Sequence, residues 1–428
     1  MKKNLLLLIL YIIPFCGVAQ FICLTNDSIS LTQESSVNCN RIHPIDANDS
    51  NLLISNYIPN DCTPIKTIRI NFNIWRLDDG TGNYWLDLPE YRDTLQMIID
   101  NLNYIYSTNV SSSDPIQGAV FISDTRVRFE IDSVYYINNS NVAFWTNVDG
   151  VNNYMLSLYP ERGNNFNYHL NLADGPGGAS GASNGYSSDR PAIITYYQRE
   201  GITTHLWGFA IHMAHEFGHN FGLNHSYSDH EVTLIDDPEF LWDLFGTETQ
   251  SWCEKPPTHV CSHDANWNCE PFDPSNTCTN NIMGGSYKAG HFTALQCGRI
   301  HRALAVSTMR KYAYGYSSTP LVISKNTTWD VKMKIYQDIV IDSSSSLTVT
   351  CTIEMVPNAS IIVRPGSKLI LDGGTLTNAC DGELWGGIFV EGDPSDATQS
   401  ENNQGVVELL NGATIENSVC AINLGLQR

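Results

Sequence analysis

The chain has 428 residues, room for two or three domains, and its 45 acidic side chains against 24 basic ones give a formal net charge of −21. This negative charge argues against nucleic acid or an anionic membrane as a partner, because both carry charge of the same sign. It favours a soluble protein.

The first 20 residues have the pattern of a secretory signal peptide. Two lysines precede the apolar stretch Leu5–Phe15, and small residues lead to a cleavage site near Gln20. The stretch is short for a membrane span, and no other long apolar run follows. We therefore expect a mature chain that has no membrane span and is secreted or held at the cell surface. An uncleaved membrane anchor is the alternative.

Residues 21–131 begin with a polar segment and continue in a β-α-β order. Residues 21–64 lack a periodic pattern, so we expect an N-terminal extension or pro-segment there. Thr67–Trp75 then alternates between apolar and polar residues, which predicts a strand with a buried face. Pro89 opens a helical pattern, and Val127–Ile131 alternates again. This order predicts an α+β domain with a mixed, twisted sheet and a backing helix.

Two further strands are expected at Tyr168–Leu172 and Ala192–Tyr196. Between them lies the small, flexible run Gly177–Ser183, which is either an edge strand of the sheet or a linker. A helix follows, beginning near Thr204 or His205, and its apolar positions predict that it is buried.

Residues 215–225 read His-Glu-Phe-Gly-His-Asn-Phe-Gly-Leu-Asn-His, with the spacing H-E-x-x-H-x-x-G-x-x-H. On a helix, His215 and His219 are one turn apart and project from the same face, so both reach a single metal ion. The backbone must turn back after the helix to supply a third ligand, and Gly222 can take the positive φ that such a turn needs. His225 then arrives from outside the helix.

This string has the chemistry of a catalytic zinc site. Three imidazoles leave one tetrahedral position of Zn²⁺ open for water, whereas a structural site is closed by four protein ligands. Zinc lowers the pKa of that water to about 7, and Glu216 is placed to take its proton and to pass it to the leaving amine. The alternative is a histidine-rich helix whose side chains only pack, with the glycine and the third histidine at these offsets by accident.

The cysteine count favours disulfides in an exported chain. Of 12 cysteines, Cys16 lies in the signal peptide, which leaves 11, an odd number. Several crowd into the Pro-, Asn- and Asp-rich region after the zinc helix, where disulfide bonds would hold a long loop. A second zinc site is the alternative, although no C-x-x-C pair occurs. The cysteines in this region are Cys253, Cys261, Cys269, Cys278 and Cys297.

From about Thr319 to the end, the sequence has the pattern of a separate β domain. Short runs of Val, Ile and Thr alternate with Asn-Gly, Gly-Gly and Pro-Gly turns, and similar phrases recur at roughly even intervals. These repeats predict the rungs of a parallel β-helix, with a β-sandwich as the alternative. The chain ends at Arg428 without a capping element, so we expect the domain to be incomplete. The phrases are Ser346–Val349, Ser360–Val363, Lys368–Gly373, Gly387–Val390 and Val406–Gly412.

The zinc string resembles that of the metzincin clan of metallopeptidases, and Asn281-Ile-Met283-Gly resembles the methionine turn beneath the metal in that clan. Together with the segment Phe292–His301, these motifs look like the pappalysin family, in particular its cytophagalysin-like, secreted bacterial branch. The resemblance covers roughly residues 65–312. It implies a metzincin-like catalytic domain with one zinc ion and with Met283 as a hydrophobic floor rather than a ligand.

Two positions depart from the family pattern. Relatives often place a tyrosine two residues after the turn methionine, where it helps to stabilise the oxyanion, but this chain has a glycine there and its nearest tyrosine is Tyr287. Relatives also tend to carry an Asp-rich calcium loop after the third histidine. Asp236 and Asp237 are the candidates for calcium here, and an ordinary solvated acidic turn is the alternative.

Relatives in the pappalysin family also suggest a cysteine switch. A thiolate from the N-terminal segment could occupy the water's position on zinc until that segment is cleaved. Cys23, Cys39 and Cys62 are the candidates, and Cys39 is our choice because it lies in the middle of the polar segment. A disulfide bond is the alternative fate of this cysteine.

These observations predict a signal peptide over residues 1–20, an extension over 21–64, a zinc endopeptidase domain over 65–316 and a β-rich domain over 319–428. Because every candidate catalytic residue precedes residue 316, we expect the chain up to that point to fold and to cleave peptides alone. A protein or peptide substrate would lie extended along the edge strand predicted near Gly177–Ser183. The alternative function is a surface adhesin or glycan-binding protein with a vestigial peptidase domain, which the intact Glu216 argues against.

Overall fold

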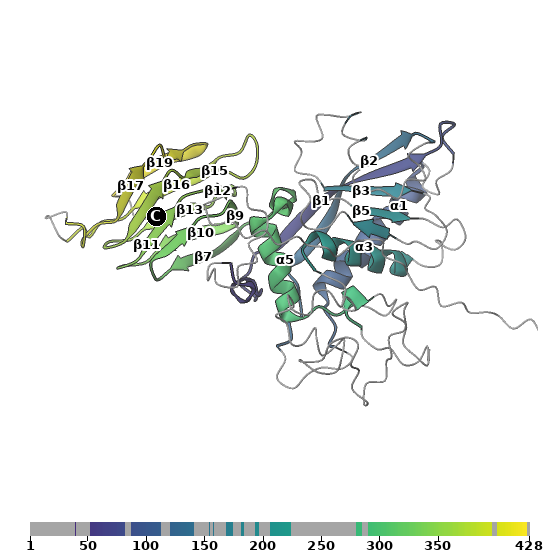
Figure 1. Ribbon diagram of the computed structural model, residues 1–428, viewed down its shortest axis with the longest axis horizontal. Coiled ribbons are helices and arrows are strands. Elements are labelled where there is room, and N and C mark those ends of the chain that lie inside the picture. The colour runs from purple at the N-terminus through teal and green to yellow at the C-terminus, as the bar shows by residue number, and fades with distance from the viewer. Residues whose placement is uncertain are drawn as a thin grey trace, which may run out of the picture.

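The computed structural model describes two packed parts joined by a central helix. On one side lies a mixed β-sheet with two helices, on the other a region of parallel strands, and helix α5 (Ala294–Val306) lies between them (Figure 1). The described residues are 39, 52–81, 87–112, 120–140, 154, 157, 168–173, 181–183, 193–196, 206–223, 280–284, 290–395 and 400–425.

The sheet of the first part is mixed, as the β-α-β order predicts. Its strand order is β2-β1-β3-β5-β4, with β4 antiparallel to β5 and the other neighbours in this order parallel. A short sixth strand, β6, pairs antiparallel with β1. The bounds are β1 Lys66–Arg76, β2 Val127–Asn138, β3 Tyr168–Ala173, β4 Gly181–Ser183, β5 Ile193–Tyr196 and β6 Ala313–Tyr314. The run Gly177–Ser183 therefore ends in an edge strand at residues 181–183, and its first four residues lie outside the described chain.

Strand β1 is an interior strand of this sheet and pairs with β2, β3 and β6. Its predicted buried face, Ile68, Ile70, Phe72 and Ile74, has no exposed surface, and two asparagines on the opposite face are equally buried. Helix α1 (Pro89–Ser107) begins with proline at its first turn and buries an apolar stripe against β2 and helix α3. The stripe consists of Leu95, Ile98, Ile99, Leu102 and Ile105. Among the helices in the described ranges, none has the length and apolar character needed to cross a bilayer.

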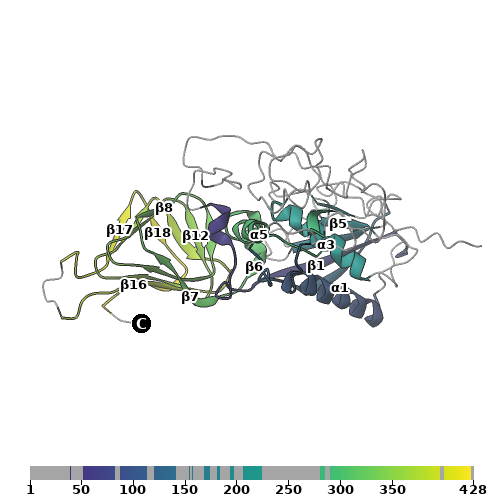
Figure 2. The same ribbon diagram turned by 90° about the horizontal axis from the view of Figure 1, so that it is seen from below.

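The second part is an all-β region of parallel strands, as the sequence predicts. It forms three sheets with the orders β19-β16-β13-β10-β7, β17-β14-β11-β8 and β18-β15-β12-β9 (Figures 1 and 2). The bounds are β7 Ser317–Ile323, β8 Thr327–Trp329, β9 Met333–Ile335, β10 Gln337–Ile341, β11 Ser346–Val349, β12 Thr352–Met355, β13 Ser360–Val363, β14 Lys368–Asp372, β15 Thr375–Asn378, β16 Trp385–Val390, β17 Val406–Leu410, β18 Thr414–Ile415 and β19 Ser418–Leu424.

Consecutive strands of this region enter the three sheets in turn, and every third strand returns to the same sheet. Val340 of β10, for example, pairs in register with Val322 of β7 on one side and with Ile362 of β13 on the other. In the middle strands of this region, alternate residues are apolar and fully buried, as at Leu347 and Ile353. The repeated phrases of the sequence are therefore the strands that stack on one another.

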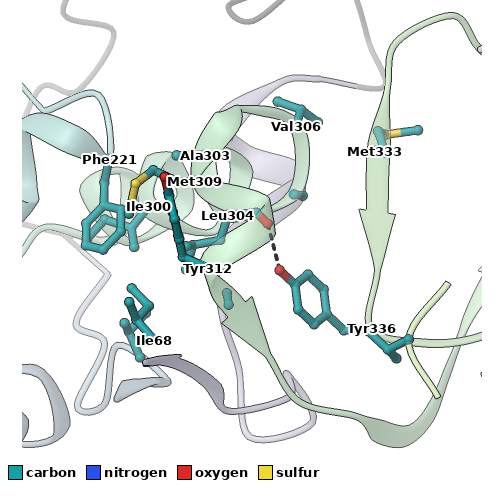
Figure 3. Packing of buried hydrophobic residues seen from close by; sticks show 14 of the residues in the cluster. Ile68, Phe221, Ile300, Ala303, Leu304, Val306, Met309, Tyr312, Met333 and Tyr336 are labelled. Carbon is teal, nitrogen blue, oxygen red and sulfur yellow. Dashed lines mark hydrogen bonds between the residues drawn. The ribbon is translucent and has the colours of Figure 1, made fainter. Parts of the chain in front are cut away.

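Helix α5 joins the two parts through one continuous hydrophobic cluster. Ile300 and Leu304 of the helix belong to the same buried cluster as Ile68 of β1 and Met333 of β9 (Figure 3). The Tyr336 hydroxyl donates a hydrogen bond of 2.7 Å to the carbonyl of Leu304. That carbonyl lies in the last turn of α5, where helix carbonyls lack a partner within the helix, so Tyr336 supplies the missing donor.

Two buried lysines lie at the same contact. The Lys66 ammonium lies 4.5 Å from the centre of the Tyr336 ring, and Lys334 donates a hydrogen bond of 2.6 Å to the carbonyl of Ala313. Burial, and then repulsion from Lys334, lowers the pKa of Lys66 to about 7. Burial likewise lowers the pKa of Lys334 to about 8. The contact therefore encloses polar groups that water would otherwise solvate.

The packed structure also begins before the predicted domain boundary at residue 65. Leu52 and Ile54 are buried, and Ile54 opens a short 3-10 helix (Ile54–Tyr57) that packs against α5. Arg302 of α5 donates a hydrogen bond of 3.0 Å to the Leu52 carbonyl. A chain cut at residue 65, or ending at residue 316, would expose apolar surface of α5 that is covered here. The sequence-based expectation of an independent unit over 65–316 omits both of these contacts.

We predict that Tyr336→Phe lowers the free energy of unfolding by about 1–3 kcal/mol, because the Leu304 carbonyl loses its donor while the ring still fills its place. Urea unfolding of the full chain, followed by circular dichroism, measures the change. Tyr104→Phe, at a tyrosine that is 53% exposed, is the control and should shift stability by less than about 0.5 kcal/mol. Equal unfolding midpoints for Tyr336→Phe and the parent chain would contradict the role given to this hydrogen bond.

Candidate metal centre

The predicted zinc helix is α3 (Leu206–Asn220), and it carries His215, Glu216 and His219. It begins within two residues of the predicted start. The helix is buried from Phe209 to its end, and all three of these side chains are buried with it. It contacts α1, the edge strand β4 and its neighbour β5, so the sheet and the backing helix fix its position.

Helix α3 ends in a Schellman motif centred on Gly222. The Gly222 residue has a φ of 85°, in the left-handed region. The amide of Leu223 donates to the carbonyl of Gly218 at 2.9 Å, and the amide of Gly222 donates to that of His219 at 3.0 Å. The predicted positive φ at Gly222 is confirmed, and the chain reverses immediately after the second histidine.

Both histidines have their Nδ1 atoms held by main-chain carbonyls. His215 Nδ1 lies 2.9 Å from the carbonyl of Ile282, and His219 Nδ1 lies 2.9 Å from that of Leu223. A carbonyl oxygen only accepts, so each Nδ1 carries the proton and, in the neutral ring, each Nε2 keeps its lone pair. The two Nε2 atoms lie 3.2 Å apart. Two lone pairs are thus directed at nearly the same point.

This geometry fits a shared zinc ion. Lone pairs that face each other repel unless a cation lies between them. Two nitrogens bound to one tetrahedral Zn²⁺ at 2.0–2.1 Å would be about 3.3 Å apart, close to the observed separation. The carbonyl partners are the outer-shell hydrogen bonds that zinc-binding histidines normally make. Glu216, one residue after the first histidine, is only 1% exposed.

Met283 lies beneath α3, where the sequence places the methionine turn. It is fully buried in the short 3-10 helix Ile282–Gly284, which contacts α3. A methyl group added to Gly218 would lie 2.5 Å from the Met283 sulfur. The Gly218 position is therefore small because the methionine side chain packs directly against the helix backbone. An isolated glycine inside a helical pattern is the sequence signal that could have revealed this contact.

Tyr106 of α1 also supports this helix. Its hydroxyl donates a hydrogen bond of 3.1 Å to the carbonyl of Ala214, the residue before His215. Its ring lies among aromatic side chains, with ring centres 4.9 Å from Phe129 and 4.8 Å from Phe292. Burial raises the pKa of the Tyr106 phenol well above its usual value, so it remains a donor. This contact joins distant parts of the sequence and was not predicted.

Several predicted site residues lie outside the described chain. These are His225, Tyr287, Asp236 and Asp237, together with Cys253, Cys261, Cys269 and Cys278 of the cysteine-rich region. The structure therefore brings together two of the three predicted zinc ligands, the candidate base and the methionine floor. Cys297, the last cysteine of that region, lies buried in α5.

Cys39 differs from its predicted role. Its sulfur forms a disulfide bond with Cys351 of the β region, 312 residues further along the chain. A cysteine in a disulfide has no thiolate to offer to zinc, so the latency switch assigned to Cys39 is corrected by this pairing. The bond ties the N-terminal segment to the β region instead of directing it to the metal site.

Comparison with protein families agrees with the site. The model of the metallo-peptidase family M12B, Reprolysin-like, matches residues 94–226, from the middle of α1 through the third histidine of the zinc string. This part of the chain is similar to the metallopeptidase domain of that family. The match includes most of α1 and all of α3 as well as the zinc string. The similarity to a metallopeptidase therefore rests on more of the sequence than the zinc string alone. No curated protein matches the chain.

Among solved structures, the chain is similar to metalloproteinase-II from Bacteroides fragilis, with 16% sequence identity and a TM-score of 0.22. The match covers 41% of this chain and 52% of that protein. The chain thus spans about half the length of that metalloproteinase.

We predict that Gly218→Ala destabilises the metallopeptidase domain by about 1–3 kcal/mol, because the new methyl group overlaps the Met283 side chain. In a Met283→Ala background the overlap is gone, and the same substitution should be neutral or stabilising, since alanine favours a helix over glycine by about 1 kcal/mol. A double-mutant cycle on urea unfolding measures this reversal of sign. An equal cost of Gly218→Ala in both backgrounds would show that Met283 is not the neighbour that matters.

Proposed function

We propose that the protein is a zinc endopeptidase whose metal is held by His215, His219 and His225. The observation that carries the proposal is the 3.2 Å approach of the two Nε2 atoms, each on a ring whose Nδ1 is held by a carbonyl. The family match to a metallopeptidase model supports the same chemistry. His225 is assigned as third ligand from the H-E-x-x-H-x-x-G-x-x-H spacing, and the left-handed φ of Gly222, which ends the helix, supports this assignment.

Glu216 is the proposed general base and acid. When bound, zinc would supply a Lewis acid that polarises the scissile carbonyl and makes a water molecule acidic near neutral pH. Glu216 accepts the proton from the attacking water and returns it to the amine that leaves. Its burial beside His215 keeps competing solvent away from this carboxylate. Tyr287 remains a proposed stabiliser of the oxyanion, and Met283 the floor below the metal.

The proposed peptide substrate lies extended along β4. This strand is at the edge of the sheet and contacts α3, so a strand added there would pass beside the two histidines. An edge strand offers unpaired amides and carbonyls, which bind an extended peptide through main-chain hydrogen bonds. Such binding gives affinity with little dependence on substrate sequence.

We further propose that the β region is part of a parallel β-helix. Strands that enter three sheets in turn and return in register after each third strand support this assignment. A β-sandwich, by contrast, is built from antiparallel sheets. Secretion after cleavage near Gln20, membership of the pappalysin family and contact with a cell surface or glycan through the β region are proposals that rest on the sequence.

The decisive test of the mechanism is Glu216→Gln. The amide cannot accept a proton but leaves the imidazoles in place, so we expect full zinc content with peptide cleavage reduced at least about 100-fold. Zinc is measured by elemental analysis and cleavage with a quenched fluorescent peptide library. A variant that cleaves at the parent rate would refute the role of Glu216.

The ligand set is tested by His225→Ala. Two imidazoles bind zinc much more weakly than three, so this variant should be isolated without stoichiometric zinc. His230→Ala removes a nearby histidine outside the zinc string and is the matched control, which should keep its metal. If His230→Ala loses zinc and His225→Ala retains it, the third ligand has been misassigned.

A further inference from the structure

The turn that contacts His215 is held by a pair of buried side-chain amides. We propose that Asn281 and Gln296 act together as positioning residues for His215, by fixing the peptide group whose carbonyl orients its imidazole. The inference rests on the proposed zinc site and adds to it two residues that do not touch the metal. Asn281 has no exposed surface, and Gln296 at the start of α5 is 3% exposed.

The two amides bond to each other in both directions. Asn281 Nδ2 donates to Gln296 Oε1 at 3.0 Å, and Gln296 Nε2 donates to Asn281 Oδ1 at 3.2 Å. Reciprocal bonds of this kind fix which end of each amide carries oxygen and which carries nitrogen. Neither side chain can rotate alone without leaving a buried polar atom unsatisfied, which is costly.

Asn281 passes this constraint to the peptide group between Ile282 and Met283. Its Oδ1 accepts the Met283 amide hydrogen at 3.0 Å. The carbonyl of the same peptide group, that of Ile282, accepts from His215 Nδ1 at 2.9 Å. A peptide group is planar and trans, so fixing the direction of its N–H also fixes the direction of its C=O. Asn281 therefore sets the orientation of the acceptor that holds the His215 ring.

Gln296 anchors the arrangement in the core. It is the third residue of α5 and shares a capping box with Thr293, whose hydroxyl accepts from the Gln296 amide at 3.0 Å while Gln296 Oε1 accepts from the Thr293 amide at 3.0 Å. A capping box alone would explain these last two bonds. It does not require Gln296 to bond to Asn281 on another segment, and that additional contact connects the buried helix to the zinc ligand.

The test measures metal binding by the full chain separately from stability. Asn281→Leu keeps the approximate shape but cannot accept the Met283 amide hydrogen, so the dissociation constant for Zn²⁺ should rise about 10–100-fold. Competition with a chromophoric chelator measures it. The visible spectrum of the Co²⁺-loaded chain should change as well, because the His215 ring is no longer held at one angle. Asn281→Asp retains the acceptor for the Met283 amide hydrogen but loses the donor to Gln296, so its dissociation constant should rise about 10-fold, at the low end of that range.

Thr293→Ala is the matched control. It removes the capping hydroxyl at the same helix end but leaves both amides in place, so it should lower the urea midpoint without changing the dissociation constant for Zn²⁺. If Asn281→Leu does not fold, Gln296→Met serves instead. It removes both bonds of the pair but leaves Asn281 its bond to Met283, and its dissociation constant should rise about 10-fold, at the low end of the expected range.

Two results would overturn the inference. One is a parent-like affinity and Co²⁺ spectrum in Asn281→Leu, or in Gln296→Met where that variant replaces it. The other is an equal loss of affinity in Thr293→Ala, which would trace the effect to helix stability. A parent chain that binds no Zn²⁺ would defeat the proposed function as well, whereas a parent chain that binds Zn²⁺ and variants that bind it equally defeat only the role of the amide pair.

Discussion

The proposed metal centre depends on two hydrogen bonds from imidazoles to main-chain carbonyls. Without them, His215 and His219 could each rotate or change tautomer and relieve the repulsion between their Nε2 lone pairs. Because both Nδ1 atoms donate to main-chain carbonyls, rotation or a change of tautomer would leave one of these carbonyls without its donor. A divalent cation bound between the two Nε2 atoms would remove this repulsion. Preorganisation of this kind raises metal affinity because little must move on binding.

The two carbonyls come from different parts of the chain, so the orientations of His215 and His219 depend on different contacts. Leu223 follows His219 directly, so its carbonyl is placed by the local reversal at Gly222. Ile282 lies 67 residues from His215, and its carbonyl is placed by tertiary contacts alone. The orientation of His219 is therefore set within one short segment. The orientation of His215 requires α5, the Asn281–Gln296 pair and the packing of Met283 against Gly218.

Helix α5 consequently serves both parts of the molecule. Its first turn holds the segment that contacts His215, and its last turn receives the Tyr336 hydroxyl from the β region. One hydrophobic cluster surrounds it on both sides. Since the helix is buried by both parts, the β region contributes to the stability of the element that supports the proposed position of His215. Lys334 of the β region, buried at the same contact with a lowered pKa, gains its hydrogen-bond acceptor, the Ala313 carbonyl, only when both parts are present.

Local patterns in the sequence predicted much of this structure. Strand β1, helix α1, the zinc helix, the left-handed Gly222 and the stacked strands all depend on hydrophobic periodicity or on a turn residue within a few positions. The roles of Tyr106, Asn281 and Gln296 depend on partners far along the chain, and no spacing rule connects them. The boundary at residue 316 was placed where the composition changes. Composition does not show that Leu52, before residue 65, and Tyr336, after residue 316, both contact α5.

The Cys39 disulfide is a second long-range contact that local patterns in the sequence do not predict. Cysteine connectivity cannot be deduced from sequence, and here the partner lies 312 residues away. Because Cys39 is bonded to Cys351, cleavage of the chain between Cys39 and the first strand would leave the N-terminal piece attached to the β region. Any activation by removal of that piece would then require reduction of the disulfide as well as proteolysis. Export to an oxidising compartment would preserve the bond, so in that setting proteolysis alone would not release Cys39 from the β region.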